Sequence, residues 1–213
     1  MTEFVIHGIH GSPFVRAVQL VLEEKGAPWR LQPMALGERE TRLKLHAFGR
    51  MPVVDHGDFR LYETQAILRY VDAVIPEPAL QPKDARAAAR MDQIIGVNDW
   101  YLFPQVTAVI GFHRIVGPKL MGLTPDEAKI AEALPNAHAC VRELERLLDG
   151  KPFLAGDSLS LADLMVAPQL TFLAMTPEGE AVLEGSPLKA WLARMDSRPS
   201  MAATRWELLD QAA

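Results

Sequence analysis

The spacing of apolar residues changes twice within residues 49–71, and few folds accommodate the order of elements that this pattern predicts. Val53 and the valine after it are β-branched and follow Pro52, which lacks an N–H and belongs at the start of a strand or on an edge strand. A His-Gly-Asp break follows, and its glycine tolerates positive φ, so two antiparallel strands can meet there. Apolar residues alternate at period two over 59–62 and return at helical spacing over 64–71. The stretch therefore predicts strand, turn, strand and helix.

Two features of this stretch point to a ligand site. Met51-Pro52 places a bulky residue before a proline at a strand entrance, which makes it a candidate for a cis bond that would turn the backbone N–H and C=O of Met51 outward. Glu63 and Thr64 stand where the helix is expected to begin, and free N–H groups and the positive end of the helix dipole attract an anion there. A small extended peptide could pair with Met51 while its α-amino-acid end binds at Glu63 and Thr64.

The remainder of the first half reads as alternating strands and helices. Strands are expected at 4–7 and 29–34, and Ser12 with the proline after it is a strong start signal for a helix between them. This order predicts parallel pairing of the two strands through a right-handed crossover. A short helix is expected within the charged residues 37–48.

A proline-dense segment at 75–78 separates this half from a second half that has few strand signals. The sequence therefore predicts an α+β domain at 1–77 followed by an all-α domain at 84–213. The first long helix is expected to bend near Gly96. Helix starts or breaks in the second half are expected at Asp84, 124–127, Ser160, Ser186 and 198–200.

Composition excludes several classes of protein. The 213 residues carry a formal net charge of −5, which disfavours nucleic acid or an anionic membrane as the main partner. Cys140 is the single cysteine, so an internal disulfide and a zinc site built on thiolates are excluded, and the histidines lack HExxH spacing. No basic leader precedes an apolar run, and no 18-residue apolar stretch occurs. We expect a soluble, cytoplasmic protein without a metal.

The motif from Met51-Pro52 to Glu63-Thr64 resembles the glutathione-binding half of the glutathione transferases, which has a cis proline in Val-Pro and a later Glu-Ser. The stretches 154–163 and 198–200 resemble signatures of the helical domain and C-terminus of that superfamily, so the resemblance covers almost the whole chain. It implies a thioredoxin-like domain followed by an all-helical domain, assembly as a homodimer, and glutathione as co-substrate. The implied activity is attack of the glutathione thiolate on an apolar small-molecule electrophile, as in detoxification.

The resemblance assigns roles to individual residues. Ser12 matches the serine of the serine-type classes, such as phi and theta, whose hydroxyl donates a hydrogen bond to the glutathione sulfur. The alternative is that Ser12 only caps its helix. Arg42 shares the basic loop that could contact the glycyl carboxylate, although a solvated loop is equally compatible. The residues expected to bind glutathione are Met51, Pro52, Glu63, Thr64, Arg39 and Arg50.

A second set of residues is expected to form the pocket for the electrophile. It combines the loop near Ser12 with one face of the long helix, where an apolar surface with a few polar tips suits a hydrophobic ligand. The same residues could equally belong to a core or an interface. The set is His10, Phe14, Asn98, Tyr101, Leu102, Gln105 and His113.

Three departures from the family pattern leave an alternative function open. Thr64 replaces the usual Ser, His46-Ala47 replaces Asn-Pro, and Arg50 replaces a frequent Gln. These changes favour a non-catalytic protein of the same fold that binds ligands or proteins. A thiol-disulfide oxidoreductase is disfavoured because residue 12 is serine and Cys140 lies far along the chain, where a buried apolar role is expected.

Overall fold

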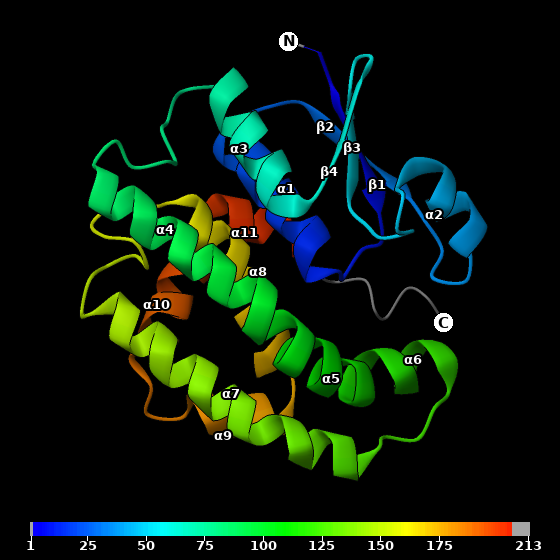
Figure 1. Ribbon diagram of the computed structural model, residues 1–213, viewed down its shortest axis with the longest axis vertical. Helices are drawn as coiled ribbons and strands as arrows, with labels where there is room; N and C mark the ends of the chain where they lie inside the picture. Colours follow the sequence, from blue (N-terminus) through cyan, green and yellow to red (C-terminus); the bar gives the residue numbers. More distant parts are fainter. Residues whose placement is uncertain (1, 206–213) are drawn as a thin grey trace. The chain divides into compact units, whose positions relative to one another are not determined.

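The computed structural model describes residues 2–205, which form two compact units. Unit 1 contains residues 2–80 together with 199–205, and unit 2 contains residues 81–198. Unit 1 is a small mixed sheet with helices, and unit 2 is predominantly helical (Figure 1). The α+β domain followed by a helical domain that the sequence predicted is therefore confirmed.

Unit 1 is built on one four-stranded sheet in the order β2-β1-β3-β4 (Figure 1). β1 and β2 are parallel, whereas β3 is antiparallel to both β1 and β4. The predicted hairpin and the predicted parallel crossover are both present. The strands are β1 Phe4–Gly8, β2 Trp29–Pro33, β3 Val53–His56 and β4 Phe59–Tyr62.

Two helices cover one face of this sheet, α1 and α3, and they pack against each other (Figure 1). α1 begins at Pro13 after the Ser12 cap, as the sequence predicted, and buries its apolar residues almost completely. Lys25 at its end pairs with buried Asp72 of α3, whose carboxylate also accepts a hydrogen bond from Leu80 N–H at 2.9 Å. The helices of unit 1 are α1 Pro13–Glu24, α2 Arg39–Leu45, α3 Thr64–Val74 and α11 Pro199–Ala203.

Helix α11 groups with unit 1, whereas the sequence analysis placed residues 199 onward in the helical domain. The reason is Arg16, a charged residue on the buried side of α1 that is only 3% exposed. Its guanidinium donates to Met201 O at 3.1 Å and to Thr204 Oγ1 at 3.3 Å. The backbone and hydroxyl acceptors near α11 thus satisfy a buried cation of α1.

Unit 2 begins with a continuous helical path from residue 85 to residue 121. The path changes to π-helical geometry at Asn98, two residues beyond the bend expected near Gly96, and Pro104 lies inside that part. The elements of unit 2 are α4 Ala85–Val97, η1 Asn98–Thr107, α5 Ala108–Gly111, η2 Phe112–Val116, α6 Gly117–Met121, α7 Glu127–Leu148, α8 Leu161–Ala174, α9 Pro177–Leu183 and α10 Pro187–Asp196.

Helix α8 forms the centre of unit 2, and nearly all of its residues are buried. It starts after Ser160, as the sequence predicted, with a capping box formed by Ser160 and Asp163. The Asp163 carboxylate accepts hydrogen bonds from the N–H groups of Leu154 and Ser160, from the Ser160 hydroxyl and from Trp191 Nε1. One carboxylate therefore ties the loop before α8 and the helix α10 to the start of the central helix.

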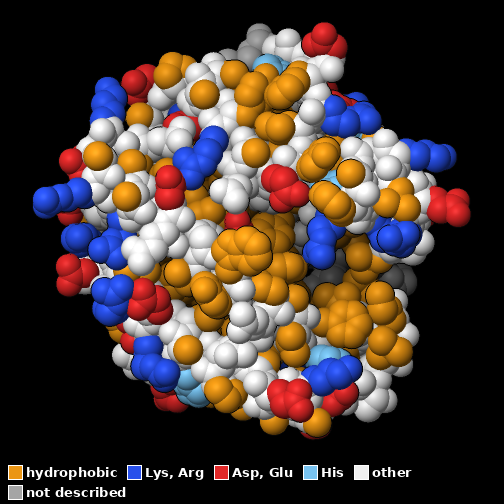
Figure 2. All heavy atoms as spheres, viewed as in Figure 1, with side chains coloured by type: hydrophobic (Ala, Val, Ile, Leu, Met, Phe, Trp, Pro, Cys, Tyr) orange, Lys and Arg blue, Asp and Glu red, His pale blue; other side chains and the backbone are white. Residues whose placement is uncertain are grey.

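The surface of the described part is mixed in charge. Figure 2 shows acidic and basic side chains interspersed with apolar ones on the viewed face. Among the helices of residues 2–205, none combines the length and the apolar composition that crossing a membrane requires.

Candidate functional site

Ser12 lies in the loop between β1 and α1 and caps α1, as expected. The preceding Gly11 has φ +84°, a conformation that favours glycine, and it turns the chain into the helix. Ser12 Oγ accepts a long hydrogen bond of 3.5 Å from Val15 N–H. Within the described residues the Ser12 hydroxyl donates to no acceptor. Capping therefore uses a lone pair of Oγ and leaves its proton available for a ligand.

The Met51-Pro52 peptide bond is cis, as the sequence suggested. Pro52 is buried, and Met51 is half-buried at the entrance to β3. The backbone N–H and C=O of Met51 form no hydrogen bond with other described residues. An extended backbone could therefore pair with this unused donor and acceptor.

Glu63 occupies the N-cap position of α3 without a capping hydrogen bond from its side chain, and its backbone is unusual, with φ 69° and ψ 108°. It is one of two non-glycine residues with positive φ among residues 2–205. Such conformations cost energy and are concentrated at ligand-binding and active sites. The Glu63 side chain is 61% exposed, while Thr64, the first residue of α3, is buried and its hydroxyl has no hydrogen-bond partner in the described chain. A carboxylate and an unused hydroxyl thus lie at the positive end of a helix dipole.

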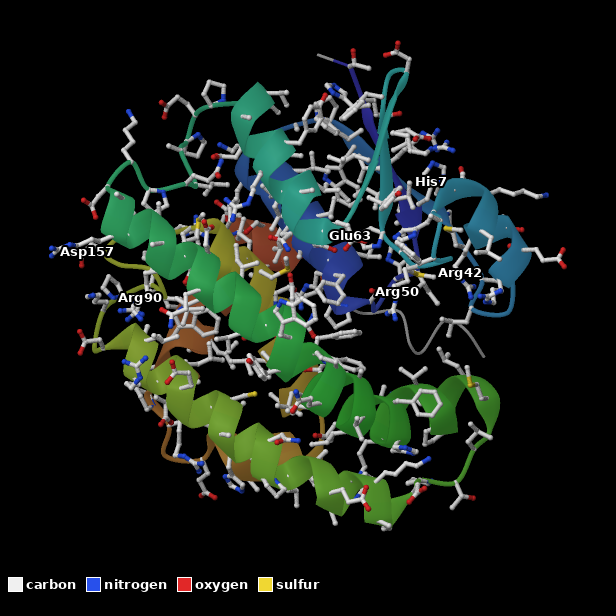
Figure 3. All side chains as sticks on the ribbon, in the orientation of Figure 1. His7, Arg42, Arg50, Glu63, Arg90 and Asp157 are labelled. Atoms are coloured by element: carbon white, nitrogen blue, oxygen red, sulfur yellow. The ribbon has the colours of Figure 1, made fainter. Side chains whose placement is uncertain are left out.

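The three arginines of the basic loop have different environments. Arg42 donates to Gly49 O at 2.9 Å, to Ala35 O at 2.8 Å and to Leu36 O at 2.6 Å, so it joins the two sides of α2 as a structural residue. Arg39 and Arg50 are exposed and form no hydrogen bond or ion pair with the described residues. Figure 3 labels Arg42, Arg50 and Glu63 in unit 1. Arg39 and Arg50 therefore remain the cations available to a carboxylate.

His46 is a site residue that the sequence analysis did not predict. It is 3% exposed, and its Nδ1 accepts a hydrogen bond from Phe48 N–H at 3.0 Å. Its ring lies 4.2 Å from that of Tyr62, and its Nε2 is 3.8 Å from Glu63 Oε1. Burial lowers the pKa of His46, the nearby Glu63 opposes this shift, and Arg50 adds to it. The only sequence signal was the replacement of Asn by His at this position.

The residues expected to line the electrophile pocket do not share one environment. Asn98 and Leu102 are fully buried within unit 2, so their assignment to a pocket surface is wrong: both lie on the core side of η1. His113 Nδ1 accepts a hydrogen bond from Asp126 N–H at 3.3 Å, which ties it to the start of α7. The remaining predicted pocket residues are accessible to different degrees: Tyr101 and His10 are exposed, and Gln105 and Phe14 are half-buried.

Other possible chemical centres have little support in the described residues. Burial raises the pKa of the Cys140 thiol to about 11, which makes it a poor nucleophile at neutral pH. No group of three or more His, Cys, Asp or Glu side chains in residues 2–205 is arranged to hold a metal ion. A surface hollow of about 660 Å³ along α8, α9 and α10 contains none of the predicted site residues.

Comparison with known proteins agrees with this arrangement. The family model described as "Glutathione S-transferase, N-terminal domain" matches residues 6–79, and "Glutathione S-transferase, C-terminal domain" matches residues 127–194. A relative from Oryza sativa subsp. japonica, "Probable glutathione S-transferase GSTF2", is 30% identical over 185 residues, which are 84% of this chain and 85% of the relative.

Two solved structures extend the comparison to the fold. Glutathione S-transferase III in its apo form is 28% identical, with a TM-score of 0.86 and coverage of 97% of this chain and 98% of that chain. Glutathione S-transferase-I bound with lactoylglutathione is 28% identical, with a TM-score of 0.84 and coverage of 94% and 97%. Sequence and structure together show that this chain belongs to the glutathione S-transferase family.

Proposed function

We propose that this protein is a glutathione transferase that activates the glutathione thiol at Ser12 for attack on an apolar small-molecule electrophile. The observation that carries the proposal is the state of the Ser12 hydroxyl. Its oxygen accepts from Val15 N–H, and its proton has no acceptor among the described residues. Ser12 can therefore cap α1 and donate to a sulfur at the same time.

Stabilisation of the thiolate is the chemical task of this donor. A free thiol has a pKa of about 8.5, so most of it is protonated at neutral pH. The Ser12 O–H would donate to the sulfur anion, and the N-terminus of α1 adds a favourable dipole. The thiol proton leaves to solvent, and the thiolate forms a C–S bond as the electrophile releases its leaving group or opens its strained ring. Serine acts as a donor here because its own hydroxyl does not readily ionise.

Unit 1 also offers complementary groups for the rest of the glutathione molecule. The unused backbone N–H and C=O of Met51, beside Pro52, would pair with the cysteinyl residue of the tripeptide. Glu63 would bind the γ-glutamyl ammonium, and the hydroxyl and N–H of Thr64 would bind the adjacent carboxylate. Arg39 or Arg50 would bind the glycyl carboxylate. The proposal includes a cytoplasmic homodimer with a detoxifying role, which family membership supports.

The test is the ultraviolet absorbance of the thiolate of bound glutathione, measured against pH for the wild type and for Ser12→Ala. We expect a wild-type thiol pKa below that of free glutathione. A hydrogen bond to a charged group contributes about 1.5–3 kcal/mol, and one pKa unit corresponds to about 1.36 kcal/mol. The substitution should therefore raise the pKa of the bound thiol by about 1–2 units.

Ser186→Ala is a matched control, because Ser186 also caps a helix that begins with proline and accepts from Leu188 N–H at 3.1 Å. Loss of this cap should lower stability without changing the pKa of the bound thiol. Bound glutathione with an unshifted pKa in the wild type would instead support the non-catalytic binding protein, which the departures at Thr64, His46 and Arg50 favour. Failure of the wild type to bind glutathione would refute the transferase function and leave a non-catalytic protein that binds other ligands or proteins.

A further inference from the structure

We propose that His46 is a positioning residue for glutathione recognition, whose imidazole Nε2–H orients the Glu63 carboxylate toward the ammonium group of the γ-glutamyl residue. The inference rests on the proposed function, because it assigns a role in binding the same ligand. It concerns a position where this chain has His instead of the Asn that is common in the family.

The hydrogen bond at Nδ1 determines which ring nitrogen carries the proton. Phe48 N–H donates to His46 Nδ1 at 3.0 Å, so Nδ1 must present a lone pair. In a neutral imidazole the other nitrogen then carries the hydrogen. This nitrogen, Nε2, is the one that lies 3.8 Å from Glu63 Oε1, beyond hydrogen-bond distance but within reach of a small rotation of the exposed carboxylate. The loop backbone thereby directs an N–H donor toward the carboxylate.

The ring is also held in place by its surroundings. His46 is 3% exposed, its ring lies 4.2 Å from the Tyr62 ring, and the Phe48 ring meets it edge-on at 5.8 Å. Glu63, by contrast, is 61% exposed and has many side-chain orientations open to it. A fixed donor beside this mobile carboxylate restricts the Glu63 side chain before the ligand arrives. Less side-chain entropy is therefore lost when the ligand binds.

The charge state of His46 decides whether this contact helps or competes with the ligand. Burial lowers the pKa of His46; of the two charged groups that act on the ring, Glu63 at the start of α3 opposes that shift and Arg50 in the adjoining loop adds to it. A neutral ring at pH 7 orients Glu63 without neutralising its charge. The full negative charge of the carboxylate then remains available to the ligand ammonium.

Two substitutions separate the two contacts of the ring. In His46→Asn, the shorter side chain keeps an oxygen near the position of Nδ1, so it can still accept from Phe48 N–H, but it does not reach Glu63. In His46→Gln, the amide nitrogen can occupy the position of Nε2 and donate to Glu63, while the acceptor for Phe48 N–H is lost. The pair distinguishes orientation of Glu63 from support of the loop.

The experiment measures binding of S-methylglutathione and of its N-acetylated derivative by calorimetry at pH 7. The first ligand carries the γ-glutamyl ammonium and the second does not, and neither has a thiol to titrate. We expect the wild type to prefer the free amine. His46→Asn should reduce this preference by about three- to tenfold, the range of one net hydrogen bond, with binding of the acetylated ligand unchanged. His46→Gln should retain the preference.

Glu63→Gln should abolish most of the preference, and adding His46→Asn to it should have little further effect, because the two residues act through one contact. Equal weakening of both ligands by His46→Asn would show a structural role and overturn the inference. An unchanged preference in His46→Asn, or the same loss in both His46 variants, would also overturn it. A wild type that binds neither ligand would refute the proposed function itself.

Discussion

Removal of the Asp163 carboxylate should severely destabilise unit 2. Asp163 has no exposed surface, and each of its oxygens accepts two hydrogen bonds. Oδ1 accepts from Leu154 N–H at 2.8 Å and from Trp191 Nε1 at 3.0 Å. Oδ2 accepts from the N–H of Ser160 at 2.9 Å and from its hydroxyl at 2.8 Å. Burial raises the pKa of Asp163, and these four donors act in the opposite direction.

The expected magnitude follows from the donors that lose their partner. Asp163→Ala leaves three buried N–H groups without an acceptor, and each costs about 1–3 kcal/mol, so the free energy of unfolding should fall by at least about 3 kcal/mol. Asp163→Asn retains one carbonyl oxygen for Leu154 and Trp191, and the Ser160 hydroxyl can rotate to accept from the amide. Only Ser160 N–H is then unsatisfied, which predicts a loss of about 1–3 kcal/mol.

Urea unfolding followed by circular dichroism and by tryptophan fluorescence measures both variants against the wild type. For a chain of this size, a loss of 1 kcal/mol lowers the Tm by about 2–4 °C, so thermal unfolding gives an independent check. Ser186→Ala, a cap with one hydrogen bond in the same unit, serves as the comparison. The reasoning is refuted if Asp163→Ala lowers the free energy of unfolding by less than about 1 kcal/mol, or if Asp163→Asn lowers it as much as Asp163→Ala does.

Three further outcomes are expected. Thr64→Ser should strengthen S-methylglutathione binding by up to about tenfold in calorimetry, because it removes a methyl group beside the ligand carboxylate; weaker binding would contradict this. Arg114 lowers the pKa of Glu127 and Glu178, and the stability that these lowered values contribute is lost as pH falls through them. Arg114→Gln should therefore reduce the free energy of unfolding at pH 7 and make it fall less steeply toward acid pH, as measured by urea unfolding. The same slope of the free energy of unfolding against pH in the variant and the wild type at acid pH would contradict this expectation. Cys140 should react with a thiol reagent only after unfolding, since its pKa is about 11; rapid native labelling would disprove its burial.

The parts of unit 1 that sequence predicted well are governed by local rules. The two changes of period within 49–71 placed the hairpin and α3, and the Ser-Pro pair placed the start of α1. The same kind of signal at Thr176-Pro177 begins α9, which the sequence analysis missed because the helix has only seven residues. Local signals thus locate an element when they are followed by enough periodic sequence.

Contacts between distant segments were not predictable in the same way. Periodicity showed that residues 98–113 are helical but did not show which side of the helix is core, and Asn98 and Leu102 were therefore misassigned. Ser12, Glu63 and Thr64 were placed at helix starts correctly, because the Ser-Pro signal and the change of period after residue 62 are local properties of the sequence. The contact of His46 with Glu63 depends on how the loop after α2 folds back, which no local rule specifies.

The place of α11 in unit 1 has a consequence for synthesis of the chain. A ribosome makes residues 2–80 before unit 2, and only afterwards residues 199–205, which supply two acceptors for Arg16. Until residues 199–205 emerge, the guanidinium of Arg16 lacks those acceptors and α1 lacks its contact with α11. We therefore expect unit 1 to mature only after residues 199–205 have been made, and a fragment cut at residue 80 to be an incomplete domain despite containing the whole sheet.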